Sequence, residues 1–188
     1  CAVFRNGWTL EAAETVIDAG RDASIVDLLE ALRDRSMILG VRDAHGHVRF
    51  RMLETLREYA EAKVDGILGA DGVRELRHRH ARAMLAWAEA TGTYDPSIEA
   101  RARLRADADN VLAAVDWSAS QGDVDGALRG LLALESIHAS RSPHALRERI
   151  ERVLTEAPQD DATVVRARIV REALFAQTNP QTTHTTLI

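Results

Sequence analysis

The chain has 188 residues and a formal net charge of −5, and 46% of its residues are hydrophobic while 4% are aromatic. It is long enough for one large or two small domains with a mainly aliphatic core. The mildly acidic balance gives no overall attraction for nucleic-acid phosphates, no apolar run reaches the roughly 20 residues of a membrane span, and the lone Cys1 excludes an internal disulfide.

Residues 1–68 predict a winged-helix domain, in which helices precede one β-hairpin. Thr9 fits the cap of a first helix beginning at Leu10, and Ser24 fits the cap of a second helix. The second helix is expected to bury its apolar residues, which are Ile25, Leu28, Leu29 and Leu32.

The hydrophobic period changes to two after the second helix. Residues 37–41 and 48–52 each fit a strand, and Gly46 lies in the turn between them. A further helix begins near Leu53. Three closely spaced glycines then predict a hinge: Gly66, Gly69 and Gly72.

Residues 72–177 carry only helical periods and predict an irregular α-solenoid of TPR-like helix pairs. Ser97 and Asp123 fit helix caps, and Pro143 fits a first helical position. The spacing between helices varies, so neighbouring helices must cover one another's apolar faces. Residues 178–188 are rich in threonine and are expected to form a flexible tail.

Several stretches resemble the winged-helix region and helical repeats of bacterial NB-ARC-type STAND ATPases, which are large transcriptional regulators. The N-terminal stretch reads VFRNGWTLEAAE at residues 3–14, and the most specific one reads FRMLETLREYA at residues 50–60. The shorter matches are DLL at 27–29, DRSMI at 34–38, RHRHA at 77–81 and DNVLAA at 109–114.

The resemblance implies a regulatory function and no catalysis by this section. Members of the family use the winged helix as a conformational relay between a nucleotide-binding core, which binds ATP or ADP, and an array of sensor repeats. The ATPase core of the same protein is therefore the first expected partner. A cytoplasmic location is expected, with no cofactor held by this section itself. The apolar start without an initiator methionine is expected of a section of a longer chain.

The resemblance breaks at the position of a nucleotide contact. Many members carry Met-His-Asp after the wing, and the histidine touches the bound nucleotide's phosphate. The matching residues here are Met52, Leu53 and Glu54, and leucine has no hydrogen-bond donor. The histidine contact is therefore not carried over, and Leu53 is expected to pack in the core. Arg51, Met52 and Glu54 remain candidates for contact with a nucleotide.

The main alternative is a self-contained winged-helix DNA-binding module. A recognition helix normally presents basic or amide side chains to DNA. The second helix instead carries three carboxylates and a single arginine, so direct binding to nucleic acid is not expected; these residues are Asp27, Glu30, Asp34 and Arg33. The support for this alternative comes from the hairpin, which carries Arg42, Arg49 and Arg51.

Independent catalysis and metal binding are not expected. The sequence has no G-x-x-x-x-G-K-[ST] phosphate loop and no G-x-S-x-G turn. His78 and His80 are two residues apart, a spacing that points the two rings away from each other on a helix. No cysteine or carboxylate pattern completes a set of metal ligands.

The helical repeats offer a surface for a protein partner or a small-molecule inducer, because stacked helix pairs form concave surfaces. The candidate partner-binding residues are Trp87, Trp117, Arg129, His138 and Arg141. Packing between helices is the favoured role of the two tryptophans. A third hypothesis is a protein-binding scaffold without a switch.

Overall fold

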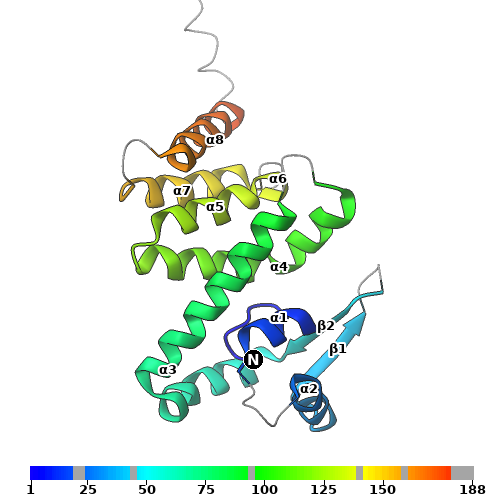
Figure 1. Ribbon diagram of the computed structural model, residues 1–188. Coiled ribbons are helices and arrows are strands. Elements are labelled where there is room, and N and C mark those ends of the chain that lie inside the picture. Colours follow the sequence, from blue (N-terminus) through cyan, green and yellow to red (C-terminus); the bar gives the residue numbers. More distant parts are fainter. Residues whose placement is uncertain (19–23, 43–45, 93–95, 139–141, 158–160, 179–188) are drawn as a thin grey trace, which may run out of the picture. The chain divides into compact units, whose positions relative to one another are not determined.

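The structure is a computed structural model that describes residues 1–18, 24–42, 46–92, 96–138, 142–157 and 161–178. It is mainly helical with one β-hairpin, so the predicted fold class is confirmed (Figure 1). Contacts divide the chain into two compact units, Cys1–Met84 and Leu85–Ile188. The predicted boundary at residues 68–72 lies within the first unit and remains a prediction. The predicted tail beyond residue 178 lies outside the described residues.

The first unit contains two short helices, a hairpin and the beginning of a long helix. Its elements are α1 (Leu10–Val16), α2 (Ile25–Asp34), β1 (Ile38–Arg42), β2 (Val48–Met52) and the first part of α3 (Glu54–Thr91). The hydroxyl of Thr9 accepts a hydrogen bond from Ala12 N at 3.3 Å, and that of Ser24 accepts one from Val26 N at 3.2 Å. Both predicted helix caps are therefore confirmed.

A third backbone segment joins the predicted hairpin. Trp8 N donates to Phe50 O at 2.9 Å, and Phe50 N donates to Trp8 O at 2.8 Å. This pairing brings the two rings to 6.3 Å, and Phe4 stacks on Trp8 at 5.4 Å. Phe4 and Trp8 are each 1% exposed, so the bridge lies over the core of the unit. The sequence does not predict the bridge, because a single paired residue shows no alternation.

The apolar face predicted for α2 is only partly correct. Leu29 is 2% exposed, whereas Leu28 is 42% exposed. Successive helix positions are rotated by about 100°, so the face that buries Leu29 and half-buries Ile25 and Leu32 leaves Leu28 at its edge. The helix therefore packs against the rest of the unit along a narrower stripe than its composition suggests.

The long helix α3 passes through the boundary between the two units. It is interrupted at Gly69, where φ is 68° and ψ is 170°. That backbone conformation is open to glycine and strained for other residues. The interruption agrees with the hinge predicted from the three glycines, although Gly66 and Gly72 themselves keep helical geometry.

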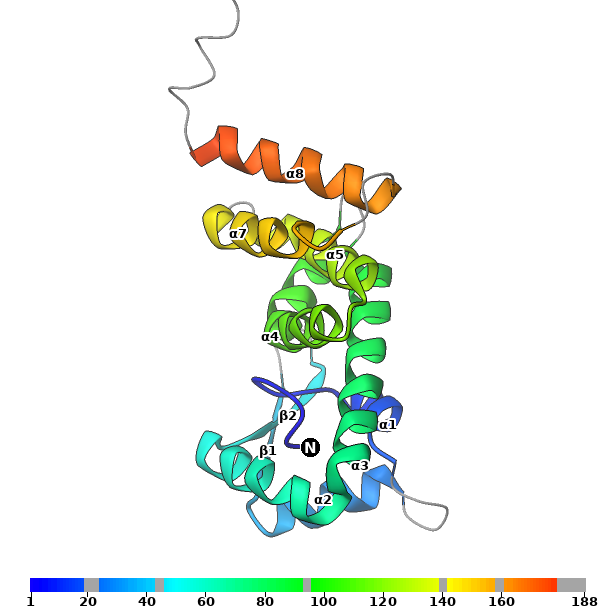
Figure 2. The ribbon, with the colours of Figure 1, turned by 90° about the vertical axis from the view of Figure 1, so that its left-hand side faces the viewer.

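The second unit is helical throughout its described residues. Besides the end of α3 it contains α4 (Ile98–Ser120), α5 (Val124–Ala133), α6 (Glu135–His138), α7 (Pro143–Leu154) and α8 (Ala162–Thr178). The α5 helix packs against α4, α7 and α8, and α7 packs against α8 (Figure 2). The fully buried side chains of this core are aliphatic, among them Leu104, Val111, Leu128, Leu131, Leu146 and Ile150.

The caps of the second unit are mostly as predicted. Ser97 Oγ accepts from Ala100 N at 3.1 Å, and Asp123 Oδ1 accepts from Gly126 N at 3.0 Å. Ser142 precedes the helix at Pro143 but makes no capping hydrogen bond through its side chain. The four-residue α6 is not predicted, because one helical turn is too short to show a period. Among the described residues, no helix is long and apolar enough to cross a membrane.

Candidate functional site

The outward face of α2 is acidic. Asp27, Glu30 and Asp34 are all exposed, and they lie three or four residues apart, which places them on one side of the helix. Arg33 lies 4.0 Å from Glu30 and 3.3 Å from Asp34, so much of its charge is already compensated. In a winged helix, the helix before the hairpin is the one that would enter a DNA groove. This α2 presents net negative charge there.

The three arginines proposed for DNA contact do not share one face of the hairpin. Arg42 lies opposite Val48, so it belongs to the other side of the ladder from Arg49 and Arg51. Arg49 is 9% exposed, whereas Arg42 and Arg51 are exposed. Arg42 also donates to the Gly46 carbonyl at 3.1 Å. Two of the three candidates are therefore accessible, on different faces.

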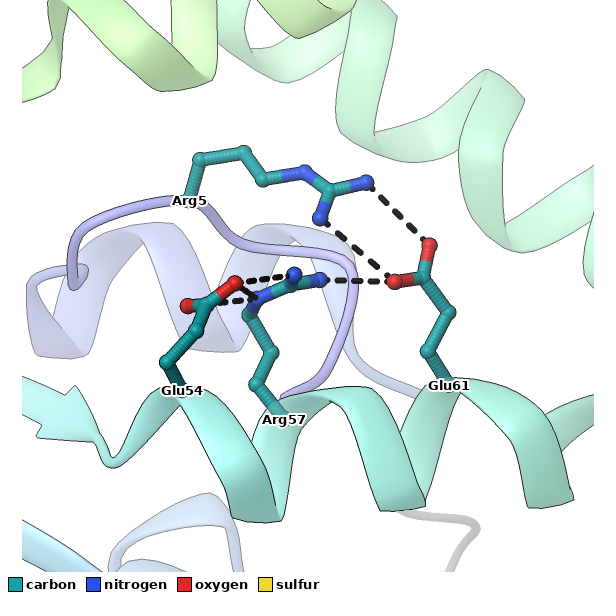
Figure 3. A network of polar contacts seen from close by, with 4 residues as sticks. All are labelled: Arg5, Glu54, Arg57 and Glu61. Atoms are coloured by element: carbon teal, nitrogen blue, oxygen red, sulfur yellow. Dashed lines mark hydrogen bonds and ion pairs between the residues drawn. The ribbon is translucent and has the colours of Figure 1, made fainter.

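A network of four charged side chains joins the N-terminal segment to the start of α3 (Figure 3). Arg57 Nε donates to Glu54 at 3.1 Å, and Arg57 Nη1 donates to Glu61 at 2.7 Å. Arg5 Nη2 donates to the other oxygen of Glu61 at 3.1 Å. The side chain of Arg57 is only 11% exposed, so both carboxylates compensate a largely buried charge. This network is not predicted from the sequence, although Arg57 follows Glu54 at i+3 and precedes Glu61 at i+4.

The network shifts the titration of its carboxyl groups. The hydrogen bond from Arg57 lowers the pKa of Glu54, and that group remains ionised to lower pH than an ordinary glutamate. Burial by itself would raise the pKa of Glu61, but hydrogen bonds and charges from Arg57 and Arg5 outweigh it and lower the pKa. In return, the hydrogen bonds to Glu54 and Glu61 and the charges of these two carboxylates raise the pKa of Arg57.

The candidates for a nucleotide contact lie where β2 passes into α3. Arg51 is exposed and Met52 is half-buried. Glu54 is occupied by Arg57, so it would have to leave this ion pair to contact a ligand. Leu53 is 57% exposed, and the prediction that it packs in the core is wrong. It precedes the first residue of α3, and its side chain is not on the buried face of that helix.

The candidate partner-binding residues are spread over the second unit. Trp87 and Trp117 are half-buried, which agrees with a packing role for both. Arg129 is exposed and pairs with Glu89 at 3.4 Å and Asp125 at 3.1 Å. The last two candidates are His138, whose pKa is lowered by burial and by the nearby charge of Arg149, and Arg141, which lies outside the described residues.

Comparison with known proteins finds a family match within the first unit. The family described as "Winged helix-turn-helix domain" matches residues 1–65. The match covers both short helices, the hairpin and the beginning of α3. No solved structure matches the chain.

Three curated proteins resemble the chain over a longer stretch. Each is 34% identical over 146 residues, which is 75% of this chain and 16% of the relative's own length. They are named "Putative HTH-type transcriptional regulator", with Mb0914c from Mycobacterium bovis and MT0914 and Rv0890c from two strains of Mycobacterium tuberculosis. Residues 1–65 therefore form a winged helix-turn-helix domain, and the chain is homologous to proteins named as HTH-type transcriptional regulators.

Proposed function

We propose that this chain is a regulatory section of a cytoplasmic HTH-type transcriptional regulator. In this proposal the winged helix packs against another module of the same protein, and the helical unit binds a signal or a partner. The relatives' names support a role in transcription, and their length, of which this chain spans 16%, leaves room for further modules. The chain itself acts as a relay and not as an enzyme.

The observation that carries the proposal is the charge of α2. The helix that would read DNA in a winged helix exposes Asp27, Glu30 and Asp34. Duplex DNA carries one negative charge per about 1.7 Å of axis, so this face opposes binding. A protein surface with basic side chains is the better partner for the same face.

The nucleotide switch is the finer part of the proposal. It rests on the resemblance of residues 50–60 to STAND ATPases and on an exposed Arg51 beside the start of α3. The absent core would bind ATP or ADP, and a change in that core would alter how the winged helix is held. TPR-like stacking of the second unit belongs to the same proposal, and its support is the packing of α5, α7 and α8 against one another.

A second candidate function is DNA binding through the wing. Arg42 and Arg51 are exposed on the hairpin, and the domain belongs to a family described as helix-turn-helix. Wing arginines suit phosphates or a narrow minor groove, where they would act without help from α2. DNA binding through the wing would be sensitive to salt and would depend on Arg42 and Arg51.

Fluorescence anisotropy of this chain with a random duplex separates the two functions. The relay predicts no binding tighter than about 100 μM at physiological salt, the weak end of non-specific affinity. Tighter, salt-sensitive binding that is lost in the Arg42→Gln/Arg51→Gln variant would establish the wing as a DNA contact. The matched control is Arg103→Gln/Arg105→Gln, which removes the same charge from exposed positions of α4.

A further inference from the structure

A cavity of about 370 Å³ lies within the second unit, between the end of α3, α5 and the beginning of α8. This volume falls within the range of sites for small organic ligands. Its walls combine a few charged groups with small or apolar residues: Glu89, Gly92, Arg129, Ala133, Thr163 and Arg166 are among them. The helices α5 and α8 that flank it are seen in Figure 2.

Small residues shape the wall of this cavity. A Cβ at Gly92 would clash with the backbone of Ala133, so the end of α3 approaches α5 closely only because residue 92 is glycine. Ala133 and Ala162 add short apolar side chains to the wall, and Leu132 adds a larger one. The wall is therefore suited to the carbon skeleton of a ligand as well as to a charged head.

The two arginines of the cavity differ in how they are compensated. Arg129 pairs with two carboxylates, Glu89 and Asp125, so its charge is fully compensated within the unit and the three groups together carry one negative charge. Arg166 is exposed and makes no hydrogen bond or ion pair with any part of the chain that the structure describes. Among the lining residues, Glu89 and Arg129 cancel and Arg166, which has no partner among the described residues, supplies one positive charge, which a monoanion placed on it would neutralise.

The beginning of α8 does not supply the anion site by itself. The amide of Thr163 already donates to Asp161 Oδ1 at 2.7 Å, and that carboxylate would oppose a second anion at the helix terminus. The charge of Arg166 and the hydroxyl of Thr163 are the groups left to hold the ligand's head.

We propose that this cavity binds a small organic carboxylate, with the carboxylate on Arg166 and the carbon skeleton against Leu132, Ala133 and Ala162. A singly charged carboxylate matches the single uncompensated arginine better than a phosphate dianion does. The proposal deepens the signal-binding part of the proposed function. Its test measures binding directly, so it stands or falls separately from DNA binding and from the nucleotide switch.

The test is a titration of the ¹⁵N-labelled 188-residue chain with benzoate, followed by chemical-shift changes. Benzoate is expected to bind with a Kd on the order of 1 mM, as a nine-atom ligand in an open pocket should. Saturable shifts are expected at Gly92, Ala133 and Thr163. Benzamide, which has the same shape without the charge, is expected to bind at least about tenfold more weakly.

Two variants and a titration with inorganic phosphate complete the test. Arg166→Gln is expected to weaken benzoate binding about tenfold, whereas Arg168→Gln, on the same helix but outside the cavity wall, leaves it unchanged. Circular dichroism checks that both variants keep their helix content. The proposal is overturned if benzoate does not saturate by about 50 mM, if benzamide or inorganic phosphate binds as well as benzoate, or if Arg166→Gln binds like the unaltered chain.

Discussion

Two helices of ten residues, α2 in the winged helix and α5 in the helical unit, differ sharply in burial. Both begin at a side-chain cap, Ser24 in one and Asp123 in the other. Only Leu29 is buried in α2, whereas seven residues of α5 are buried. The α5 helix has α4, α7 and α8 around it, whereas α2 has α1 and β1.

The difference separates the helix that holds its unit together from the helix that is presented outward. Two glycines within α5 are also buried: Gly130 lets Leu85 and Val115 approach the backbone, and Gly126 leaves room for the capping side chain of Asp123. The outward side of α2 carries charge and leaves Val26 42% exposed. In the first unit, α2 therefore supplies an outward surface. The stability of the unit depends on other contacts: the stacked rings of Phe4, Trp8 and Phe50, the Trp8–Phe50 bridge and the network around Arg57.

Truncation of a core side chain in α5 should produce the largest effect. Leu131 is 0% exposed, and Leu131→Ala is expected to lower the free energy of unfolding of the helical unit by about 2–5 kcal/mol, because it removes apolar contacts and leaves a cavity. Urea unfolding followed by circular dichroism measures this change.

The matched change in α2 is Leu28→Ala. Because Leu28 is 42% exposed, its truncation should alter stability by no more than about 0.5 kcal/mol. If both variants lost similar stability, α2 would be as deeply packed as α5, and the contrast on which the docking role of α2 depends would disappear.

Local signals in the sequence predict most of the fold. Thr9, Ser24, Ser97 and Asp123 are polar caps ahead of helical periods, and each cap forms a hydrogen bond with its own helix. These interactions span two or three residues, so sequence spacing alone specifies them. The alternation of residues 48–52 likewise predicts a strand.

Contacts between distant residues are not predicted in the same way. Trp8 pairs with Phe50, and Arg5 reaches Glu61, across 42 and 56 positions of the chain. No periodicity relates such residues. The exposure of Leu28 and Leu53 is also missed, because apolar residues are expected inside, while burial depends on which elements are available to cover them.

The site is predicted less completely than the fold. Both Arg129 and Arg166 lie in the cavity wall. The sequence identifies Arg129 as a candidate for partner binding, but it does not identify Arg166. On the sequence, Arg166 is one of several arginines along α8, and only the packing of α8 against α5 distinguishes it. Charge on a helix surface is common, so its position beside a cavity is the informative property.

The bridge in the first unit should be the next most sensitive feature. Gly7 has φ of 102°, and a Cβ there would lie 2.6 Å from Phe50 O. Gly7→Ala combines a left-handed backbone with a steric clash, so it should destabilise the winged helix by about 2–4 kcal/mol. Urea unfolding followed by circular dichroism and by tryptophan fluorescence measures the change, because Trp8, one of the chain's three tryptophans, forms the bridge.

A second glycine provides the control. Gly46 also has positive φ, 86°, but its Cβ would meet nothing within 4 Å. Gly46→Ala should therefore cost only the backbone strain, about 1–2 kcal/mol. Equal losses in the two variants would show that the close approach to Phe50 contributes nothing, and the bridge could not then be a main support of this unit.

The smallest of the three effects is expected from the ionic network, and it should depend on pH. Arg57→Gln removes a largely buried partner of Glu61 and should destabilise the winged helix by about 1–2 kcal/mol at neutral pH. The pKa values of Glu54 and Glu61 are lowered in the folded state. Their contribution is therefore present above the ordinary glutamate pKa of about 4.3 and is lost as pH falls through the lowered values.

The unaltered chain should accordingly lose more stability between neutral pH and pH 3 than Arg57→Gln does, because the variant has already lost most of this contribution. Arg74→Gln is the control: Arg74 pairs with Asp71 at 2.7 Å, but their side chains are 63% and 89% exposed. An exposed pair of this kind contributes about 0–1 kcal/mol. If Arg57→Gln and Arg74→Gln had the same acid profile, burial of Arg57 would contribute nothing. The first unit would then depend, as the second does, on its apolar contacts.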